Sequence, residues 1–134
     1  MSRKYRVGFV WVGFTSGFFM NGWKAVPERA EVVALCDVVP SQIAKRKQSH
    51  PETCGKAAEY TDYREMLEKE HLDIVCLCTY GDWRLEHTEY CLERGKHLFI
   101  EKPVGHTMEE ARRFQFLARK YPNLRVAVAY TLRY

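Results

Sequence analysis

The sequence predicts an α/β fold in which a parallel sheet is doubly wound, with helices on both of its faces. Short continuous apolar runs, such as residues 5–12 and 74–79, are typical of strands that are buried on both faces. Helix-length segments separate these runs, so each connection is a crossover and neighbouring strands run in parallel. A chain of 134 residues is the right length for one such domain.

The N-terminal half contains three of the expected strands. Its elements are a strand at 5–12, a helix at 15–25, a strand at 31–36, a helix at 40–48 and a short edge strand at 59–61. Pro27 ends the first helix, and Pro40 opens the second because proline fits the first turn of a helix. We expect residues 49–56 to form a loop.

The C-terminal half repeats the alternation. Its elements are helices at 62–70, 83–94 and 107–120 and strands at 74–79, 98–100 and 125–130. Asp62 with Glu65, and Thr107 with Glu110, have the spacing of capping boxes. Gly95 stands where a helix ends in a glycine cap. Six strands joined by five crossovers predict the strand order 3-2-1-4-5-6 of a Rossmann-like, dinucleotide-binding domain.

Composition excludes several classes of partner. The net charge of +4 is mild, and the densest basic run, residues 45–47, fits the solvent face of a helix better than a nucleic-acid surface. No apolar stretch is long enough to span a bilayer, and no signal peptide is visible. The five cysteines lack metal-type spacing, and four of them, Cys36, Cys76, Cys78 and Cys91, fall in predicted strands or helices as core residues would, which favours a reducing cytoplasm. We therefore expect no metal, no nucleic acid and no membrane partner.

The turn after the first strand has the context of a dinucleotide site. Such a site needs a strand, a glycine-rich turn and a helix whose N-terminus faces the pyrophosphate. In the motif Gly-x-Gly-x-x-Gly, the second glycine survives as Gly13, the third is Ser16 and the first is Trp11. The indole must either turn into the core or lie in the nucleotide cleft. The candidate cofactor-binding residues of this turn are Val12, Gly13, Phe14, Thr15 and Ser16.

Asp37 follows the second strand, where an acid accepts hydrogen bonds from the adenosine ribose. The same carboxylate would repel the 2′-phosphate of NADP. Two like charges 4 Å apart repel by about 4 kcal/mol at an effective dielectric constant near 20, and each remaining 1.4 kcal/mol is about tenfold in affinity. Asp37 therefore predicts NAD as the cofactor, with NADP less favoured.

A third signal lies at the fifth strand, where Gly95, Lys96 and His97 precede three apolar residues and then Glu101, Lys102 and Pro103. The charges could simply form a surface salt bridge. The order of residues from Gly95 to Pro103, however, resembles the signature of the Gfo/Idh/MocA family of sugar and polyol dehydrogenases. The likeness extends over residues 6–134. It implies that Lys102 lies beside the nicotinamide ribose and the substrate as the candidate catalytic residue. It also places Glu101 and Pro103 at the cofactor, with the proline often after a cis peptide bond.

The chain departs from the family pattern after the fourth strand. Relatives usually read Thr-Pro-Asn and, three residues later, His; here Thr79, Tyr80, Gly81 and Arg84 occupy these positions. Thr79 and Tyr80 remain candidates for cofactor binding, Thr79 through its hydroxyl. Relatives also continue into a second α/β domain that supplies the substrate pocket and the usual catalytic histidine. The resemblance therefore implies that residues 1–134 are the NAD(P)-binding domain alone, and none of the five histidines can be given the catalytic role.

Two functions follow from this reading. The first is the nucleotide-binding domain of an NAD(P)-dependent oxidoreductase that acts on a sugar, a polyol or a related hydroxy compound and is inactive alone. The alternative is a non-catalytic module that senses a nucleotide or contacts another protein on the same scaffold. A different Rossmann enzyme such as a methyltransferase is disfavoured by the Glu-Lys-Pro segment. Association into a homo-oligomer stays open.

Overall fold

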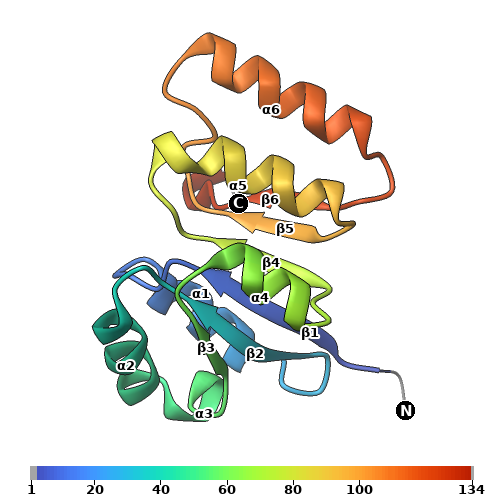
Figure 1. Ribbon diagram of the computed structural model, residues 1–134. Coiled ribbons are helices and arrows are strands. Elements are labelled where there is room, and N and C mark those ends of the chain that lie inside the picture. The colour runs from blue at the N-terminus through green and yellow to red at the C-terminus, as the bar shows by residue number, and fades with distance from the viewer. Residues whose placement is uncertain (1–2, 134) are drawn as a thin grey trace.

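Six parallel strands form the centre of the protein, in the order β3-β2-β1-β4-β5-β6 (Figure 1). The structure is a computed structural model that describes residues 3–133. The chain starts in the middle of the sheet, winds outward to β3, returns to β4 and winds outward again to β6. The α/β fold and the predicted strand order are confirmed.

The first, fourth and sixth strands are shorter than predicted, while the second and fifth each begin one residue earlier. They are β1 (Tyr5–Val10), β2 (Ala30–Cys36), β3 (Ala58–Tyr60), β4 (Ile74–Leu77), β5 (His97–Ile100) and β6 (Val126–Val128). β1 ends at Val10 because Trp11 has a φ of 65°, in the left-handed region, which takes the chain out of the sheet. Val12 and Thr79 therefore lie in loops at the ends of β1 and β4 rather than within strands.

The helices are those expected, with one addition. They are α1 (Ser16–Lys24), α2 (Pro40–Ser49), α3 (Pro51–Cys54), α4 (Tyr63–Lys69), α5 (Gly81–Glu93) and α6 (Met108–Lys120), followed by a 3₁₀ turn at Thr131–Arg133. The prediction that residues 49–56 form a loop was wrong, because Pro51 starts the short helix α3 and its last residue, Cys54, is buried. α5 also begins earlier than predicted, at Gly81.

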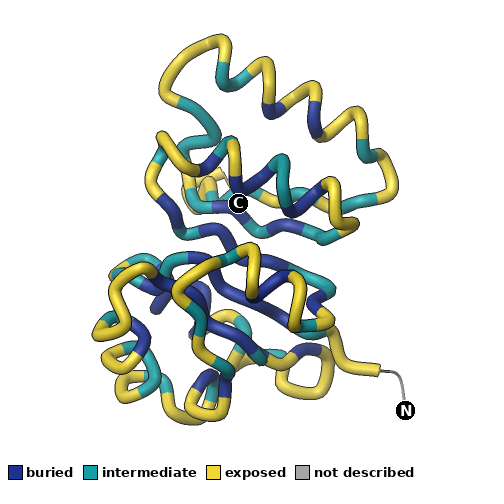
Figure 2. Tube along the Cα trace, in the orientation of Figure 1, coloured by how far each residue is buried: buried dark blue, intermediate teal, exposed yellow. Residues whose placement is uncertain are grey.

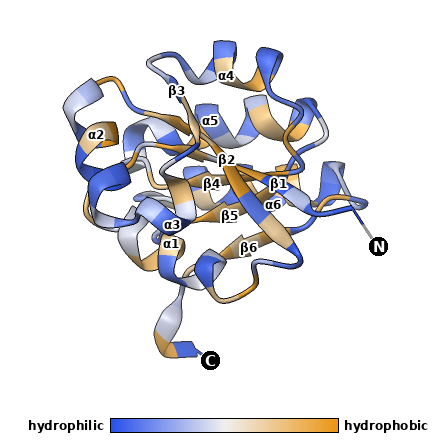
Figure 3. Cartoon of the chain, turned by 90° about the horizontal axis from the view of Figure 1, so that it is seen from below, coloured by the Kyte–Doolittle hydropathy of each residue, from blue (hydrophilic) through white to orange (hydrophobic). Residues whose placement is uncertain are grey.

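Two apolar layers hold the helices to the sheet. On one face, α4, α5 and α6 contribute Met66, Leu92 and Leu117 to the core. On the other face, α1 and α2 contribute Met20 and Ile43. Figure 2 shows buried residues along the strands and on the inner sides of the helices. Figure 3 shows α4 on one side of the sheet and α1 and α3 on the other.

The helix ends agree with the predicted caps, except at α4. Thr107 and the side chain of Glu110 form the complete capping box of α6. Asp62 caps α4 by accepting a hydrogen bond from the Arg64 backbone N–H at 2.8 Å. The second half of that box is missing, since the Glu65 side chain pairs with Lys69 instead.

Replacing Thr107 with Ala should lower the free energy of unfolding by about 1 kcal/mol, because the Glu110 backbone N–H loses its acceptor. Urea denaturation measures the effect. Thr61→Ala is the matched control, since Thr61 is exposed and caps no helix. Equal unfolding midpoints for the two variants would contradict the role of the box.

Candidate cofactor site

The loops after β2, β1, β4 and β5 meet at one edge of the sheet, because parallel strands end together there. These four strands are neighbours, and their loops, together with the first residue of α1, carry every candidate cofactor-binding residue. In strand order, the loops hold Asp37, then the turn from Trp11 to Ser16, then Thr79 and Tyr80, then Glu101, Lys102 and Pro103.

The turn between β1 and α1 is held by a hydrogen bond within it and leaves free space beside Gly13. The Gly13 carbonyl accepts a hydrogen bond from Ser16 Oγ at 2.7 Å. A Cβ added to Gly13 would meet no atom within 4 Å, so the space beside this residue is free. Free space at the second glycine of the motif suits close approach by a phosphate. Ser16 is fully buried, so it serves as the small residue that lets α1 pack on the sheet.

Trp11 packs on the core, one of the two arrangements that the sequence left open. Its backbone N–H donates to the Cys36 carbonyl at 2.7 Å, and its half-buried indole packs against the core on the α4 and α5 face. The ring also makes an edge-to-face contact with Tyr80, with ring centroids 5.4 Å apart. The indole therefore rests on the core and also reaches the sheet edge.

Asp37 is only 6% exposed and holds the turn in place. Its Oδ2 accepts from the Val12 backbone N–H and its Oδ1 from the Val39 backbone N–H, both at 2.9 Å. Each carboxylate oxygen keeps a further lone pair, so these bonds are compatible with a ribose hydroxyl. In the same turn, Phe14 is 81% exposed and Thr15 caps α1 without a side-chain hydrogen bond.

Arg84 joins the loops after β4 and β5. It is 3% exposed, and its two terminal nitrogens donate to the carbonyls of Thr79 and Pro103. Burial lowers the pKa of Arg84 from its usual value. The sequence suggested only that a charge replaces an imidazole at this position; the structure shows a buried bridge between two loops.

The Glu101 side chain does not pair with Lys102. Glu101 Oε1 accepts a hydrogen bond from the Lys102 backbone N–H at 2.9 Å, and no salt bridge joins the two side chains within residues 3–133. The Lys102–Pro103 peptide bond is cis. The exposed Lys102 lines a hollow of about 650 Å³ together with residues 129–133.

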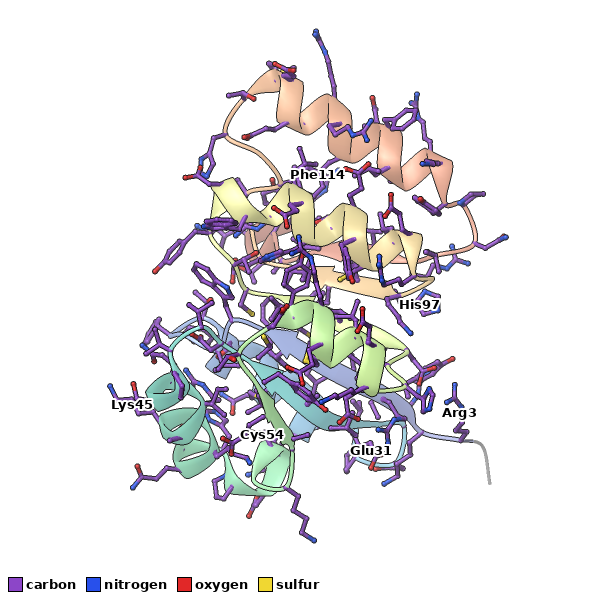
Figure 4. All side chains as sticks on the ribbon, viewed as in Figure 1. Arg3, Glu31, Lys45, Cys54, His97 and Phe114 are labelled. Carbon is purple, nitrogen blue, oxygen red and sulfur yellow. The ribbon has the colours of Figure 1, made fainter. Side chains whose placement is uncertain are left out.

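Sequence reasoning missed Arg46. Its neighbour Lys45 lies on the outer side of α2, as the basic run predicted (Figure 4). Arg46 instead turns inward, and its Nη2 donates to the Gly13 carbonyl at 2.7 Å. No local pattern could reveal this contact, because the partner lies in a loop 33 residues away.

His87 is a core residue of α5 and not a candidate acid–base group. Burial lowers the pKa of His87 to about 4, so its imidazole is neutral near pH 7. Within residues 3–133 no group of His, Cys, Asp and Glu could hold a metal ion. The helices of this part of the chain are also too short or too polar to cross a membrane.

The remaining features suit a dinucleotide. Thr79 Oγ1 is buried and has no hydrogen-bond partner among the described residues, so it is available to a bound group. Together with the open Gly13 and the buried Asp37, it fits a polar ligand that lies along this edge.

A family model described as an oxidoreductase family with an NAD-binding Rossmann fold matches residues 5–130. The chain belongs to the Gfo/Idh/MocA family. It is an NAD-binding domain of the Rossmann type.

Curated relatives of this Gfo/Idh/MocA domain include glycosyl hydrolases. It is 29% identical over 113 residues to glycosyl hydrolase family 109 protein 1 of Bacteroides thetaiotaomicron, a match that covers 78% of this chain and 23% of the relative. It is 32% identical over 110 residues to the alpha-N-acetylgalactosaminidase of Shewanella oneidensis, covering 78% of this chain and 24% of the relative. The chain thus spans about a quarter of the length of these relatives.

Solved structures share the fold. An oxidoreductase domain protein from Kribbella flavida matches with a TM-score of 0.86 and 25% identity, covering 98% of this chain and 36% of that one. The scyllo-inositol dehydrogenase of Lactobacillus casei, solved with bound NAD(H) and scyllo-inositol, matches with a TM-score of 0.84 and 23% identity. That match covers 98% of this chain and 37% of the dehydrogenase.

Proposed function

We propose that this chain is the cofactor-binding domain of an oxidoreductase that transfers a hydride between NAD and a hydroxyl-bearing carbon of a sugar, a polyol or a related compound. One observation carries the proposal. Asp37, the open turn at Gly13, Thr79 and Lys102 follow one another along a single sheet edge. This is the order in which the ribose, pyrophosphate and nicotinamide parts of a dinucleotide meet a Rossmann sheet.

Each residue then has a role that its chemistry allows. The Asp37 carboxylate accepts from the adenosine ribose, and the backbone N–H groups of Phe14 and Thr15 face the pyrophosphate. The Thr79 hydroxyl lines the nicotinamide side. The Lys102 ammonium orients the ribose and the substrate hydroxyl, and a lysine so placed can move a proton. When bound, the nicotinamide supplies the hydride acceptor or donor.

We propose further that the substrate-binding residues lie outside residues 1–134, so this chain alone does not turn over substrate. The chain spans 23–24% of its curated relatives and 36–37% of two solved ones, which leaves room for a second domain in such proteins. Catalysis needs substrate, proton carrier and cofactor held together, and a displacement of about 1 Å can cost a hundredfold in rate. The relatives named for inositol and for N-acetylgalactosamine support a polyhydroxylated substrate.

Replacing Lys102 with Met should weaken NAD binding by about threefold to tenfold, because a charged hydrogen bond at an exposed position is lost. Calorimetric titration of the chain with NAD measures the change. Lys45→Met is the matched control, since Lys45 lies on the outer side of α2. An equal loss of NAD affinity in the two variants would contradict the role proposed for Lys102.

A screen of sugars and polyols with NAD, followed by the absorbance of the reduced cofactor, tests the second part. We expect no turnover by residues 1–134. Turnover that disappears in the Lys102→Met variant would mean that the active site is complete within these residues.

A nucleotide-sensing or protein-interaction module is the second candidate. It is favoured by the changes at the cleft, where Trp11, Tyr80 and Gly81 replace residues that the family usually carries. NAD binding combined with inactivity in a natural protein that extends beyond residue 134 would support this candidate.

Four of the five free cysteines are buried, which supports our proposal of a reducing compartment such as the cytoplasm for either function.

A further inference from the structure

Trp11 has a backbone conformation that is unusual for a large residue. It has a φ of 65°, and no other non-glycine residue among 3–133 has a positive φ. A residue with a Cβ pays a steric penalty in this region, which is why glycine suits the position. Strained backbone of this kind tends to persist at functional sites, where another interaction compensates for it. The strain therefore raises the question of what the indole contributes.

The partner of the indole is an exposed ring. Tyr80 is 75% exposed, yet it holds an edge-to-face contact with Trp11 at an interplanar angle of 81°. Neither the Trp11 indole N–H nor the Tyr80 hydroxyl makes a hydrogen bond within the described chain. The pair thus presents aromatic surface and two free donors at the edge of the sheet.

The strand order places this pair in the path of the cofactor. Asp37 follows β2 and Lys102 follows β5, while Trp11 follows β1 and Tyr80 follows β4. In the sheet, β1 and β4 lie side by side between β2 and β5. A dinucleotide that reaches from Asp37 to Lys102 must cross the ends of β1 and β4, where the two rings meet.

We propose that Trp11 and Tyr80 form an aromatic platform that contacts the middle of the dinucleotide, between its two ends. The platform would replace the glycine and proline that relatives usually carry with ring surface for a ribose and donors for the pyrophosphate. Trp11 is then a cofactor-contacting residue, and this contact offsets its backbone strain. The inference rests on the proposed placement of NAD between Asp37 and Lys102.

Substitution at Trp11 separates a platform from an obstruction by the sign of the effect. Trp11→Gly restores the family's residue and removes the steric penalty that a Cβ has at this positive φ, so this variant should fold. If the ring obstructs the site, Trp11→Gly binds NAD more tightly. If the ring is a platform, both Trp11→Gly and Trp11→Leu bind NAD about threefold to tenfold more weakly, the range expected for a lost aromatic contact. Tyr80→Leu should weaken binding similarly.

The measurements are calorimetric titration with NAD, thermal unfolding of each variant, and the indole N–H resonances of the unaltered chain during the titration. Trp23 is the internal control, because its indole donates to Cys76 Sγ at 3.2 Å under the other face of the sheet. We expect the Trp11 resonance to move on saturation while the Trp23 resonance stays. Saturable binding with an unmoved Trp11 resonance, or tighter binding by a folded Trp11→Gly variant, would overturn the platform alone. No saturable binding by the unaltered chain would overturn the proposed function as well.

Discussion

Replacing Asp37 with Asn should reduce the preference of this domain for NAD over NADP by about tenfold. The carboxylate is 6% exposed at the end of β2, so its charge is poorly screened by water. Removing the charge removes its repulsion of a 2′-phosphate, and about 1.4 kcal/mol of that repulsion is tenfold in relative affinity. The same variant should lower the free energy of unfolding by about 1–3 kcal/mol, because the Asn amide keeps only one acceptor for the N–H groups of Val12 and Val39.

Calorimetric titration with both cofactors and urea denaturation check the two parts of this prediction. Glu28→Gln is the control, since it removes one negative charge from an exposed site in the loop before β2. The role of Asp37 in cofactor choice would be wrong if the unaltered domain bound NAD and NADP equally, or if both variants changed the ratio of affinities by the same factor.

Replacing Arg84 with Met should lower the free energy of unfolding by about 2–3 kcal/mol. The guanidinium donates to the carbonyls of Thr79 and Pro103, and truncation leaves both without this donor. Part of the loss is recovered, because the folded protein no longer has to desolvate a charge that has no carboxylate within salt-bridge distance among the described residues.

Chemical denaturation measures this change, with Arg64→Met as the matched control. Arg64 is exposed and pairs with Glu86 at 2.7 Å, and such a surface pair contributes about 0–1 kcal/mol. NAD binding should also weaken in Arg84→Met, since the bridge holds the loops that carry Thr79 and Lys102. An Arg84→Met variant as stable as the Arg64→Met control would show that the bridge does not stabilise these loops.

Local patterns predicted most of the architecture. The apolar runs located five of the six strands, because a strand buried within the sheet needs apolar side chains at consecutive positions; the remaining strand, β3, was predicted only as a short edge strand. The capping box at Thr107 and the glycine at position 95, with its φ of 71°, located the ends of two helices. The alternation of strands and helices then left the doubly wound strand order as the simplest arrangement. α3 was missed because a single turn of helix has no periodicity to detect.

The sequence by itself determined the family, the parallel fold and the sheet edge on which Asp37, Gly13, Thr79 and Lys102 gather. These follow from residues close in the chain, since each strand, turn and helix is encoded locally. Only the tertiary structure decided how that edge is built. Arg46 holds the Gly13 carbonyl from α2, Arg84 joins the loops after β4 and β5, and Trp11 meets Tyr80 across the sheet. Apart from the bond between Arg84 and Thr79, these contacts join residues far apart in sequence. Their geometry depends on how whole elements pack, so no local pattern specifies them.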